Sequence, residues 1–426
     1  MYVKRVVVTG LGVISPVGND LETFWKNLKQ GVCGVGMITR FDTTDFKVKV
    51  AAEVKDFDPL AYLEKSELRK TDLYAQYAIA AATQAVKDSC ILGTLPSERL
   101  GVYVGSGIGG MSTFMENEEK LITSGPRRIS PHFIPMMISN IAAGSIAIRF
   151  DCEGPSLPVV TACATSTNTI GEAFRAIRYG YADAIIAGGA EATINPLAVA
   201  GFTNCMALST KNIPEESSIP FDKRRDGFVM GEGAGMLVLE EYEHARARGA
   251  KIYAEISGYG NTCDAHHVTA PHPEAKGAAR AITLALEEAG YLPQKDTVYI
   301  NAHGTSTPLN DKAETLAIKK AFGKQASQVR ISSTKSMTGH MLGAAGAVEA
   351  IASVMALKEG TIPPTIGYKE PDQDCDLDYT PNRAVTAALT LALSSSLGFG
   401  GHNGVLALRK INYETPKTVE DGGTRK

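Results

Sequence analysis

One cysteine and two histidines of this chain lie in turns of small residues, each close behind an apolar run. Cys163 follows VVTA, His303 follows VYINA, and His340 ends the segment SSTKSMTGH. A thiol with an imidazole in reach is a pair that performs nucleophilic catalysis. Taken alone, each residue also has a structural reading, because most free cysteines behave as small buried hydrophobes. Taken together, the three favour a covalent catalyst.

The sequence around Cys163 predicts a reactive thiol. A β-branched run before it indicates a strand, and TSTNTIGEAF after it indicates a helix. Unpaired backbone N–H groups at a helix N-terminus favour an anion, so we expect a lowered pKa for this thiol. Ala162 and Ala164 leave room for a substrate, and the N–H groups of the turn can hold a developing oxyanion.

A second histidine and a lysine point to a step beyond thiol deprotonation. One imidazole suffices to take the proton of a thiol, yet Lys335 and His340 share a further turn. Neutral imidazole N–H groups can hold an oxygen that gains negative charge, such as that of an enolate. The set therefore suggests carbon–carbon bond formation from a decarboxylating thioester. For each residue by itself, a structural histidine or a surface lysine remains the alternative.

Strand-like and helix-like segments alternate along the chain, which is typical of a layered α/β fold. RVVVTGLGV, LGVYVG, DAIIAGGAEA and GAGMLVLEE indicate strands. TDLYAQYAIAAATQAVKDS indicates a long helix capped by Thr71 or Asp72. We expect the catalytic groups at strand-to-helix junctions, where α/β folds collect them.

The two halves of the chain repeat the same order of units. KRVVVTGLGV and IYAEISGYGN each open a half, and VVTACATSTNTIGEAFRAI resembles RISSTKSMTGHMLGAAGAVEAIAS as strand, turn and helix. GFVMGEGAGMLVLEE and GFGGHNGVLALRK are both glycine loop then strand. We therefore predict a duplicated fold with halves 1–250 and 251–411, followed by a polar tail, 412–426. Shared α/β composition is the alternative.

The composition limits the classes of partner. Across 426 residues the net charge is −3, which gives no field that favours nucleic acid or an anionic membrane. No apolar run reaches the ~20 residues of a membrane helix, and the N-terminus reads as a strand rather than a signal peptide. Seven scattered cysteines without a C-x-x-C pattern fit reduced thiols, so we expect a cytoplasmic protein.

The glycine loop GSGIGG satisfies the G-x-G-x-x-G pattern of dinucleotide-binding folds through Gly105, Gly107 and Gly110. The segment that follows, MSTFMENEEKLITSGPRRISP, shows no second strand that ends in an acidic residue. An NAD-dependent oxidoreductase is therefore the weakest alternative.

Four segments taken in order resemble a known family. TACATSTN, NAHGTSTPLND, STKSMTGHMLGAAGAVEA and GFGGHN are similar to the β-ketoacyl-acyl carrier protein synthases, most of all to the synthase II group of bacterial fatty acid synthesis. The resemblance covers nearly the whole chain. It implies the duplicated thiolase fold, a five-layered αβαβα structure, and a homodimer.

The resemblance implies a role for each motif. Cys163 takes the acyl chain from an acyl carrier protein, with the backbone N–H groups of Cys163 and Phe399 as the oxyanion hole. His303 and His340 hold the thioester oxygen of malonyl carrier protein while carbon dioxide leaves, and Lys335 supports them. No redox cofactor is required, because the loss of carbon dioxide drives the condensation, and phosphopantetheine is carried by the acyl carrier protein. The implied supporting residue is Glu349, which has a solvated helical face as its alternative.

The resemblance also implies binding residues. The acyl pocket and the phosphopantetheine arm are expected at Ile108, Phe202, Thr305, Thr307, Gly398 and Gly400, with Phe399 as a gate. Docking of the acidic carrier protein is expected at Lys65, Arg69, Lys70, Arg127 and Arg128. A structural cation is expected at Asn301, Glu314, Glu349 and Ser394, whose oxygens suit a hard cation.

Other members of the superfamily fit less well. A non-catalytic partner subunit would lack the nucleophile, whereas Cys163 is present. A thiolase would carry a second active-site cysteine where this chain has GFGGHN, and synthase III would carry an asparagine in place of His340. A polyketide ketosynthase shares the same residues and stays open as the alternative.

Overall fold

A computed structural model describes residues 3–411 of the protein. Within them, the main sheet is mixed, with strand order β4-β5-β6-β1-β7-β13-β12-β8-β9. These strands are β1 (Val6–Ile14), β4 (Leu100–Gly105), β5 (Ala184–Glu191), β6 (Gly233–Glu241), β7 (Ala254–Cys263), β8 (Val298–Asn301), β9 (Arg330–Ser332), β12 (Leu391–Gly398) and β13 (His402–Arg409). The halves join where β1 pairs with β7 over three residue pairs. Two small sheets are formed by β2 (Gly36–Met37) with β3 (Val50–Ala51), and by β10 (Thr361–Ile362) with β11 (Val385–Thr386).

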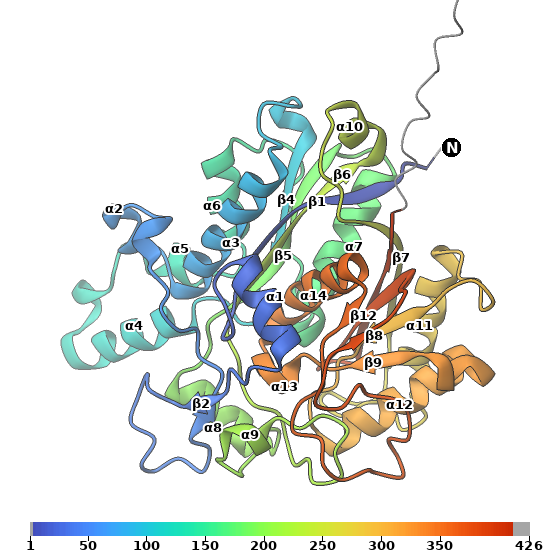
Figure 1. The fold of residues 1–426 in the computed structure, drawn as a ribbon. Coiled ribbons are helices and arrows are strands. Elements are labelled where there is room, and N and C mark those ends of the chain that lie inside the picture. The colour runs from blue at the N-terminus through green and yellow to red at the C-terminus, as the bar shows by residue number, and fades with distance from the viewer. Residues whose placement is uncertain (1–2, 412–426) are drawn as a thin grey trace, which may run out of the picture.

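Helices cover the sheet in three layers (Figure 1). The outer layer of the first half is α3 (Leu73–Ser89) with α6 (Ile141–Phe150), the middle layer is α7 (Thr165–Arg178) with α14 (Ala345–Glu359), and the outer layer of the second half is α11 (Lys276–Glu288) with α12 (Pro308–Phe322). The remaining helices are α1 (Leu21–Gln30), α2 (Lys65–Leu68), α4 (Met111–Ser124), α5 (Phe133–Met137), α8 (Pro196–Asn204), α9 (Pro214–Ser217), α10 (Tyr242–Ala247) and α13 (Lys335–Thr338). The layer order αβαβα expected from the sequence is confirmed.

The strand registers repeat between the halves. Ala184 of β5 pairs in parallel with Leu100 of β4 and antiparallel with β6. In the second half, Leu391 of β12 pairs in parallel with Val298 of β8 and antiparallel with β13. The two halves therefore have the same topology, as the repeated motifs predicted. The boundary at residue 250 stays a prediction, and the tail 412–426 lies outside the described residues.

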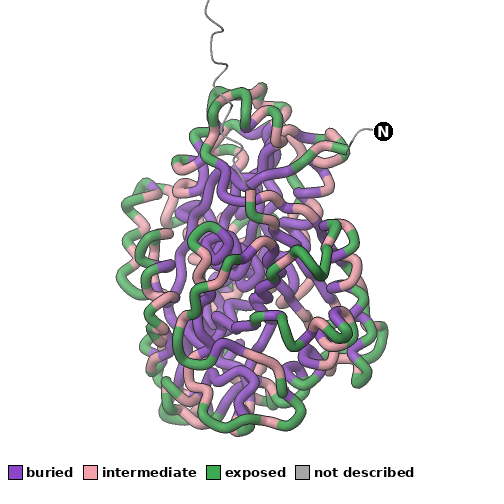
Figure 2. The backbone as a smooth tube through the Cα atoms, turned by 45° about the vertical axis from the view of Figure 1, so that its right-hand side comes forward, coloured by how far each residue is buried: buried purple, intermediate pink, exposed green. Residues whose placement is uncertain are grey.

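The central helices are largely buried, because strands from both halves of the main sheet pack against them; Figure 2 shows that the buried backbone lies in the middle of the molecule. In α14 the run Ala345–Leu357 is buried throughout, as expected for a helix that is apolar all round. The alternative of a solvated face at Glu349 is thus wrong, since this residue is 2% exposed. The cap of α3 is Asp72, whose carboxylate accepts the Tyr74 N–H. Among the described residues, every helix is too short or too polar to cross a membrane.

Candidate active site

Cys163 lies at the start of the central helix α7. A short 3₁₀ turn, Ala162–Ala164, leads into the helix, and Ala162 turns the chain with a positive φ of 51°. The helix N-terminus predicted at Cys163 is confirmed, but the strand predicted before it is wrong: residues 157–161 form no strand, and only Ser156 makes a bridge, to Val102. The thiol is partly exposed and faces a cavity.

The expected lowering of the Cys163 pKa is wrong. Burial raises the pKa of this thiol to about 12, and the charge of Lys335 and the backbone N–H groups of Phe399 and Cys163 only partly oppose that effect. The reason is physical: a helix N-terminus favours a thiolate, but a site roofed by the other half of the chain removes the water that stabilises the anion. The resting nucleophile is therefore a protonated thiol. The same two N–H groups contact the sulfur, and donors so close to the nucleophile are available to the oxyanion that forms when it attacks a carbonyl.

His303 and His340 lie side by side in the same cavity. Their ring centroids are 5.2 Å apart and the rings are nearly perpendicular, at 87°. Their Nδ1 atoms are buried without a hydrogen-bond partner. Burial, and then the positive charge of Lys335, hold the pKa of both imidazoles well below the usual range. Both rings are thus neutral at physiological pH and can donate N–H groups.

Backbone contacts fix the two histidines. His303 follows β8, where the N–H groups of His303 and Gly304 each donate to Glu314 at 2.7 Å. The His340 N–H donates to the Val229 carbonyl at 2.7 Å, and the Gly231 N–H returns a bond to the His340 carbonyl at 2.8 Å. The backbone of each histidine is therefore fixed by a residue of another element: Glu314 lies on α12, and Val229 comes from the first half.

Lys335 and Glu349 form a buried ion pair beneath the histidines. The Lys335 ammonium donates to one carboxylate oxygen of Glu349, and these side chains are 1% and 3% exposed. Burial raises the pKa of Glu349 to about 7, although Lys335 opposes the shift. Loss of one partner from such a pair costs about 3–5 kcal/mol, because a buried charge is left alone. Lys335 is thus held where its charge keeps the imidazoles neutral.

One cavity of about 380 Å³ collects most of the predicted residues. Those that line it are Cys163, Phe202, His303, Thr305, Thr307, His340, Gly398 and Phe399. Ile108 and Gly400 do not line this cavity, and Ile108 is 42% exposed. Cys205 and Met206 line the same cavity, and Met206 is 88% exposed, which places this part of the lining at the surface.

Phe399 lines the same cavity as the thiol. Its ring centroid is 6.5 Å from that of Phe202. A Cβ on the preceding Gly398 would come within 2.7 Å of the Thr161 carbonyl oxygen, so glycine is required for the Phe399 N–H to approach Cys163. The next residue, Gly400, has a φ of 87° and bonds to Val268. This backbone favours glycine, and the gate role of Phe399 stays a prediction.

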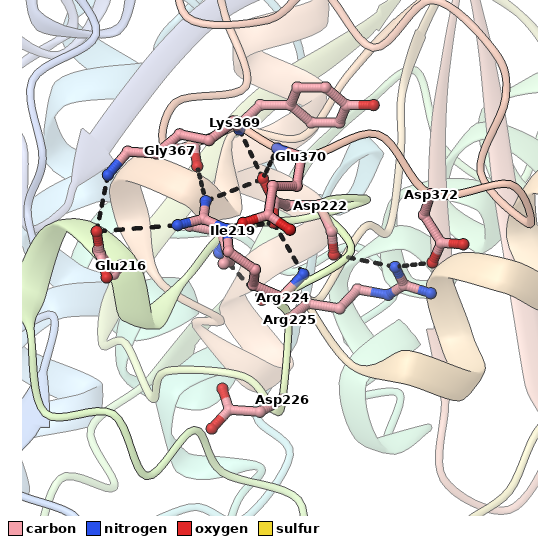
Figure 3. Close-up of polar contacts among 12 residues, drawn as sticks. Glu216, Ile219, Asp222, Arg224, Arg225, Asp226, Gly367, Lys369, Glu370 and Asp372 are labelled. Atoms are coloured by element: carbon pink, nitrogen blue, oxygen red, sulfur yellow. Dashed lines mark hydrogen bonds and ion pairs between the residues drawn. The ribbon is translucent and has the colours of Figure 1, made fainter.

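The sequence analysis missed a polar network around Asp222, Arg224 and Arg225, which Figure 3 shows together with residues 367–372. The guanidinium of Arg225 bonds to Asp372 at 2.5 Å and to the Pro308 carbonyl at 3.2 Å. Asp222 accepts two side-chain bonds from Arg224 and the backbone N–H groups of Lys369 and Glu370. The adjacent charges in KRRDGF were the available signal, but only the fold shows their partners. The network ties the hydroxyl-bearing loop to residues 367–372.

The four residues predicted to hold a cation come from four elements, with Asn301 at the end of β8, Ser394 inside β12, Glu314 on α12 and Glu349 on α14. Asn301 pairs in register with Ser394, and its amide bonds to the Glu349 carbonyl at 3.5 Å. One carboxylate oxygen of Glu349 and the hydroxyl of Ser394 are buried without partners. Both Glu314 oxygens are engaged by backbone N–H groups. The orphaned oxygens fit a hard cation in part, and the cation stays a prediction.

The five cations predicted to dock a carrier protein are all exposed. They come from two segments, with Lys65, Arg69 and Lys70 in and after α2, and Arg127 and Arg128 at the end of the turn that follows α4. Their placement is compatible with docking.

Comparison with known families decides the class of protein. The family model of the β-ketoacyl synthase N-terminal domain matches residues 3–245, and that of the C-terminal domain matches residues 253–369. The chain belongs to the β-ketoacyl synthase family. This synthase is 52% identical to "3-oxoacyl-[acyl-carrier-protein] synthase 2" of Staphylococcus aureus (strain COL), over 96% of this chain and 99% of that protein. It is 51% identical to the protein of the same name from Synechocystis, over 96% of this chain and 98% of that one.

Solved structures agree with this assignment. This synthase has a TM-score of 0.89 and 35% identity to a β-ketoacyl synthase from Burkholderia phymatum, covering 96% of this chain and 100% of that one. The TM-score, identity and coverage are the same for a type II polyketide ketosynthase solved in complex with its acyl-carrier protein. The fold is that of the thiolase-like ketosynthases, and the protein is a condensing acyltransferase.

Proposed function

We propose that this protein is a 3-oxoacyl-[acyl-carrier-protein] synthase II, which lengthens fatty acyl chains by two carbons. The observation that carries the proposal is the single cavity that holds Cys163 together with the two neutral imidazoles of His303 and His340. A nucleophile and two donors for an enolate oxygen are what a decarboxylative condensation needs. The names of the relatives at 51–52% identity support the same reaction.

In the first half-reaction, the Cys163 sulfur attacks the carbonyl of an acyl thioester. A carbon–sulfur bond forms to Cys163, the bond to the carrier's pantetheine sulfur breaks, and the thiol proton ends on the departing pantetheine. The N–H groups of Cys163 and Phe399 stabilise the tetrahedral oxyanion. Because the resting thiol is protonated, its proton must leave during the attack rather than before it.

In the second half-reaction, a malonyl thioester loses carbon dioxide to form an enolate. The imidazole N–H groups of His303 and His340 hold the enolate oxygen. The carbanion then attacks the acyl carbonyl on Cys163, so that a carbon–carbon bond forms and the carbon–sulfur bond to Cys163 breaks. The thiolate released from the acyl group takes up a proton from solvent, and a 3-oxoacyl chain leaves on the carrier protein.

The reaction requires no redox cofactor, because the loss of carbon dioxide drives the condensation. Phosphopantetheine belongs to the carrier protein, and the hydroxyl groups of Thr305 and Thr307, which line the cavity, would hold it. We place the reaction in the cytoplasm, where a discrete carrier protein would supply both thioesters.

The partner is an acidic acyl carrier protein in its acyl and malonyl forms. Its docking face would be the five exposed cations Lys65, Arg69, Lys70, Arg127 and Arg128. Exposed charge pairs of this kind raise the association rate more than they tighten the complex. The structural neighbour solved with its acyl-carrier protein supports this mode of delivery.

A homodimer would cover an exposed edge of the first half. β4 is an edge strand of the main sheet, and its residue Val102 forms a parallel bridge to Ser156. The nearby Leu157 and Val160 are 44% and 51% exposed. An exposed edge with apolar side chains is a site for pairing with a second copy. Ile108 belongs to the same half and would be covered with it. The test is the molar mass in solution.

The proposed function is tested by product analysis. The purified protein is incubated with malonyl carrier protein and acyl carrier proteins of several chain lengths. A 3-oxoacyl carrier protein two carbons longer than the primer is expected. Successive unreduced extensions would instead indicate a polyketide ketosynthase, and no extension with any primer would contradict a condensing function.

A further inference from the structure

A carboxylate that the mechanism does not use is buried beside the active site. Glu191, the last residue of β5, is fully buried. Its carboxylate accepts four hydrogen bonds, from the Ser106 hydroxyl at 3.0 Å and from the backbone N–H groups of Gly107 at 2.9 Å, Ile108 at 3.2 Å and Gly343 at 3.0 Å. One side chain thus ties the loop after β4 in the first half to a turn of the second half.

The duplication explains where this carboxylate lies. Since Ala184 and Leu391 hold the same place in their sheets, Glu191 corresponds to Gly398. The turn Leu342–Ala344 before α14 likewise corresponds to the turn that carries Cys163, and each begins with a positive φ, 46° at Leu342 and 51° at Ala162. Gly343 is therefore the counterpart of Cys163.

The duplication gives two equivalent sites, one with Cys163 and one with Gly343, and the carboxylate of Glu191 fills the one with Gly343. In one site, Gly398 packs against the turn of the nucleophile. In the other, Glu191 stands at the place of Gly398 and accepts the N–H of Gly343, which stands at the place of the nucleophile. The duplication has produced one site that binds substrate and one that is closed by a carboxylate.

Two glycines beside the Glu191 carboxylate leave the space that it occupies. A Cβ on Gly107 would lie 2.6 Å from a carboxylate oxygen of Glu191, and a Cβ on Gly343 would lie 2.8 Å from the same atom. Distances below 3.0 Å force a shift, so a side chain at either position would break the contact. Burial raises the pKa of Glu191 to about 7, whereas the four donors favour the ionised form.

The two segments that Glu191 holds by hydrogen bonds contribute side chains that pack around Cys163. Leu342, Met111 and Cys163 pack in one apolar cluster, together with Val199 and Phe202. Leu342 adjoins Gly343, and Met111 closes the loop that begins at Ser106. The loop also approaches the nucleophile turn directly, because a Cβ on Gly107 would lie 3.6 Å from the Ala162 carbonyl oxygen.

We propose that Glu191 is a positioning residue that sets the acyl-chain preference by fixing two walls beside Cys163, formed by Met111 at the end of the loop from Ser106 and by Leu342 in its turn. The inference rests on the proposed function, since it assigns the wall that a Cys163-bound chain meets. It concerns the acyl half-reaction alone. The malonyl half-reaction uses His303 and His340, which Glu191 does not touch.

Glu191→Gln is the sharpest variant. A glutamine amide has one oxygen and one NH₂ group, and a backbone N–H cannot donate to that NH₂. The Ser106 hydroxyl can accept from it, so the amide nitrogen is expected to face Ser106 and Ile108. The bonds from Gly107 and Gly343 then survive on the oxygen, while the bond from Ile108 is lost. The variant therefore loosens one wall and keeps the halves joined.

The matched control is Glu232→Gln. Glu232 is also a buried carboxylate of the first half, at 1% exposure, and it accepts from Arg40 and from the Val54 N–H. Like Glu191, it does not line the cavity, but its partners Arg40 and Val54 lie outside the apolar cluster that contains Cys163. Both substitutions thus remove one buried charge at equal volume, but only one of them acts on the walls beside Cys163.

The experiment measures two half-reactions. Transfer of acyl groups of several lengths to Cys163 is followed by mass spectrometry, and malonyl decarboxylation is measured in a Cys163→Gln background. For Glu191→Gln we expect transfer of the preferred chain to fall by about tenfold, as for a lost hydrogen bond to a charged group. We also expect a changed order of chain lengths, with decarboxylation unchanged. Glu232→Gln should alter neither half-reaction.

Each other outcome counts against the inference. An unchanged length profile in Glu191→Gln, or an equal loss of both half-reactions, would assign Glu191 to general stability. If Glu191→Gln does not fold, Ser106→Ala serves instead, because it removes one donor to Glu191 and the acceptor of the Gly109 N–H. A wild-type protein that transfers no acyl group at all would contradict the proposed function rather than this inference.

Discussion

The imidazole rings of His303 and His340 meet edge to face, with centroids 5.2 Å apart. Each is held by a backbone bond to a different element, His303 by Glu314 of α12 and His340 by Val229 of the first half. Burial and then the charge of Lys335 lower the pKa of both rings. Two neutral donors can therefore share one oxygen without repelling each other, and on this ground we assign the pair, in the proposed function, to the malonyl half-reaction.

Removing either imidazole should separate the two half-reactions. We expect His303→Ala or His340→Ala to slow malonyl decarboxylation by ~10²–10³-fold, the cost of one oxyanion donor. Acyl transfer to Cys163 should persist, because its oxyanion hole is built from backbone N–H groups. Radiolabelled carbon dioxide release and intact-protein mass measure the two steps. Loss of acyl transfer with decarboxylation intact would reverse the assigned roles.

Removing the charge of Lys335 should move the acid limb of the pH profile. Because that charge lowers the pKa of both histidines, Lys335→Met should raise their pKa values toward the usual range. Protonation then begins at higher pH, so decarboxylation should fail at a higher pH than in the wild type. The double variant Lys335→Met/Glu349→Gln, which leaves no buried charge alone, should show the same shift. An unmoved acid limb in both variants would refute the coupling.

The resting Cys163 thiol should alkylate slowly at neutral pH. Since burial raises its pKa to about 12, the thiolate fraction grows about tenfold per pH unit well above pH 8. The rate of iodoacetamide addition to Cys163 should rise steadily across that range. The exposed Cys205 of the same protein provides an internal comparison. A plateau for Cys163 below pH 8 would indicate a preformed thiolate.

The sequence predicted the fold and the reacting groups more fully than their electrostatics. Repeated motifs gave the duplication, and β-branched runs before small-residue turns located Cys163 and His303. The pKa of Cys163 was predicted with the wrong sign, because its burial depends on residues from the other half of the chain. Periodicity within one segment carries no such information.

Glu191 and Arg225 were missed for a related reason. Their sequence contexts, AGGAEAT and KRRDGF, resemble an ordinary strand end and a charged surface loop. What distinguishes them is the partners they meet, Gly343 for one and Pro308 for the other. A lone acidic residue at the end of an apolar, glycine-rich strand was the available signal for Glu191.

A larger side chain at Ile108 tests the acyl-pocket prediction. This residue is 42% exposed in the single chain, so it would reach the pocket only when a second copy covers it. Ile108→Phe should then shorten the longest product by filling space, as overpacked sites do. The distribution of product lengths gives the answer. An unchanged distribution in a dimeric variant would show that Ile108 does not face the acyl chain.

Two glycine substitutions should respond differently to loss of Glu191. Gly107→Ala should destabilise the protein by roughly 1–3 kcal/mol, because its Cβ meets the Glu191 carboxylate. The next atom from that Cβ is 3.5 Å away, so Glu191→Ala should relieve the cost. Gly343→Ala should not be relieved, because its Cβ would still lie 2.3 Å from the Gly107 nitrogen. Denaturant unfolding of the single and double variants measures the free energy of unfolding, and so the coupling of each glycine substitution with Glu191→Ala.

The central claim is that Cys163 carries the acyl chain. The direct measurement is peptide mass spectrometry after incubation with an acyl carrier protein thioester, with Cys163→Ala as the control. The account predicts one acyl mass on the Cys163 peptide, absent in Cys163→Ala, together with loss of condensation by ~10³-fold or more in that variant. Acylation of Cys205, the other thiol that lines the cavity, or retained chain elongation by Cys163→Ala would contradict it.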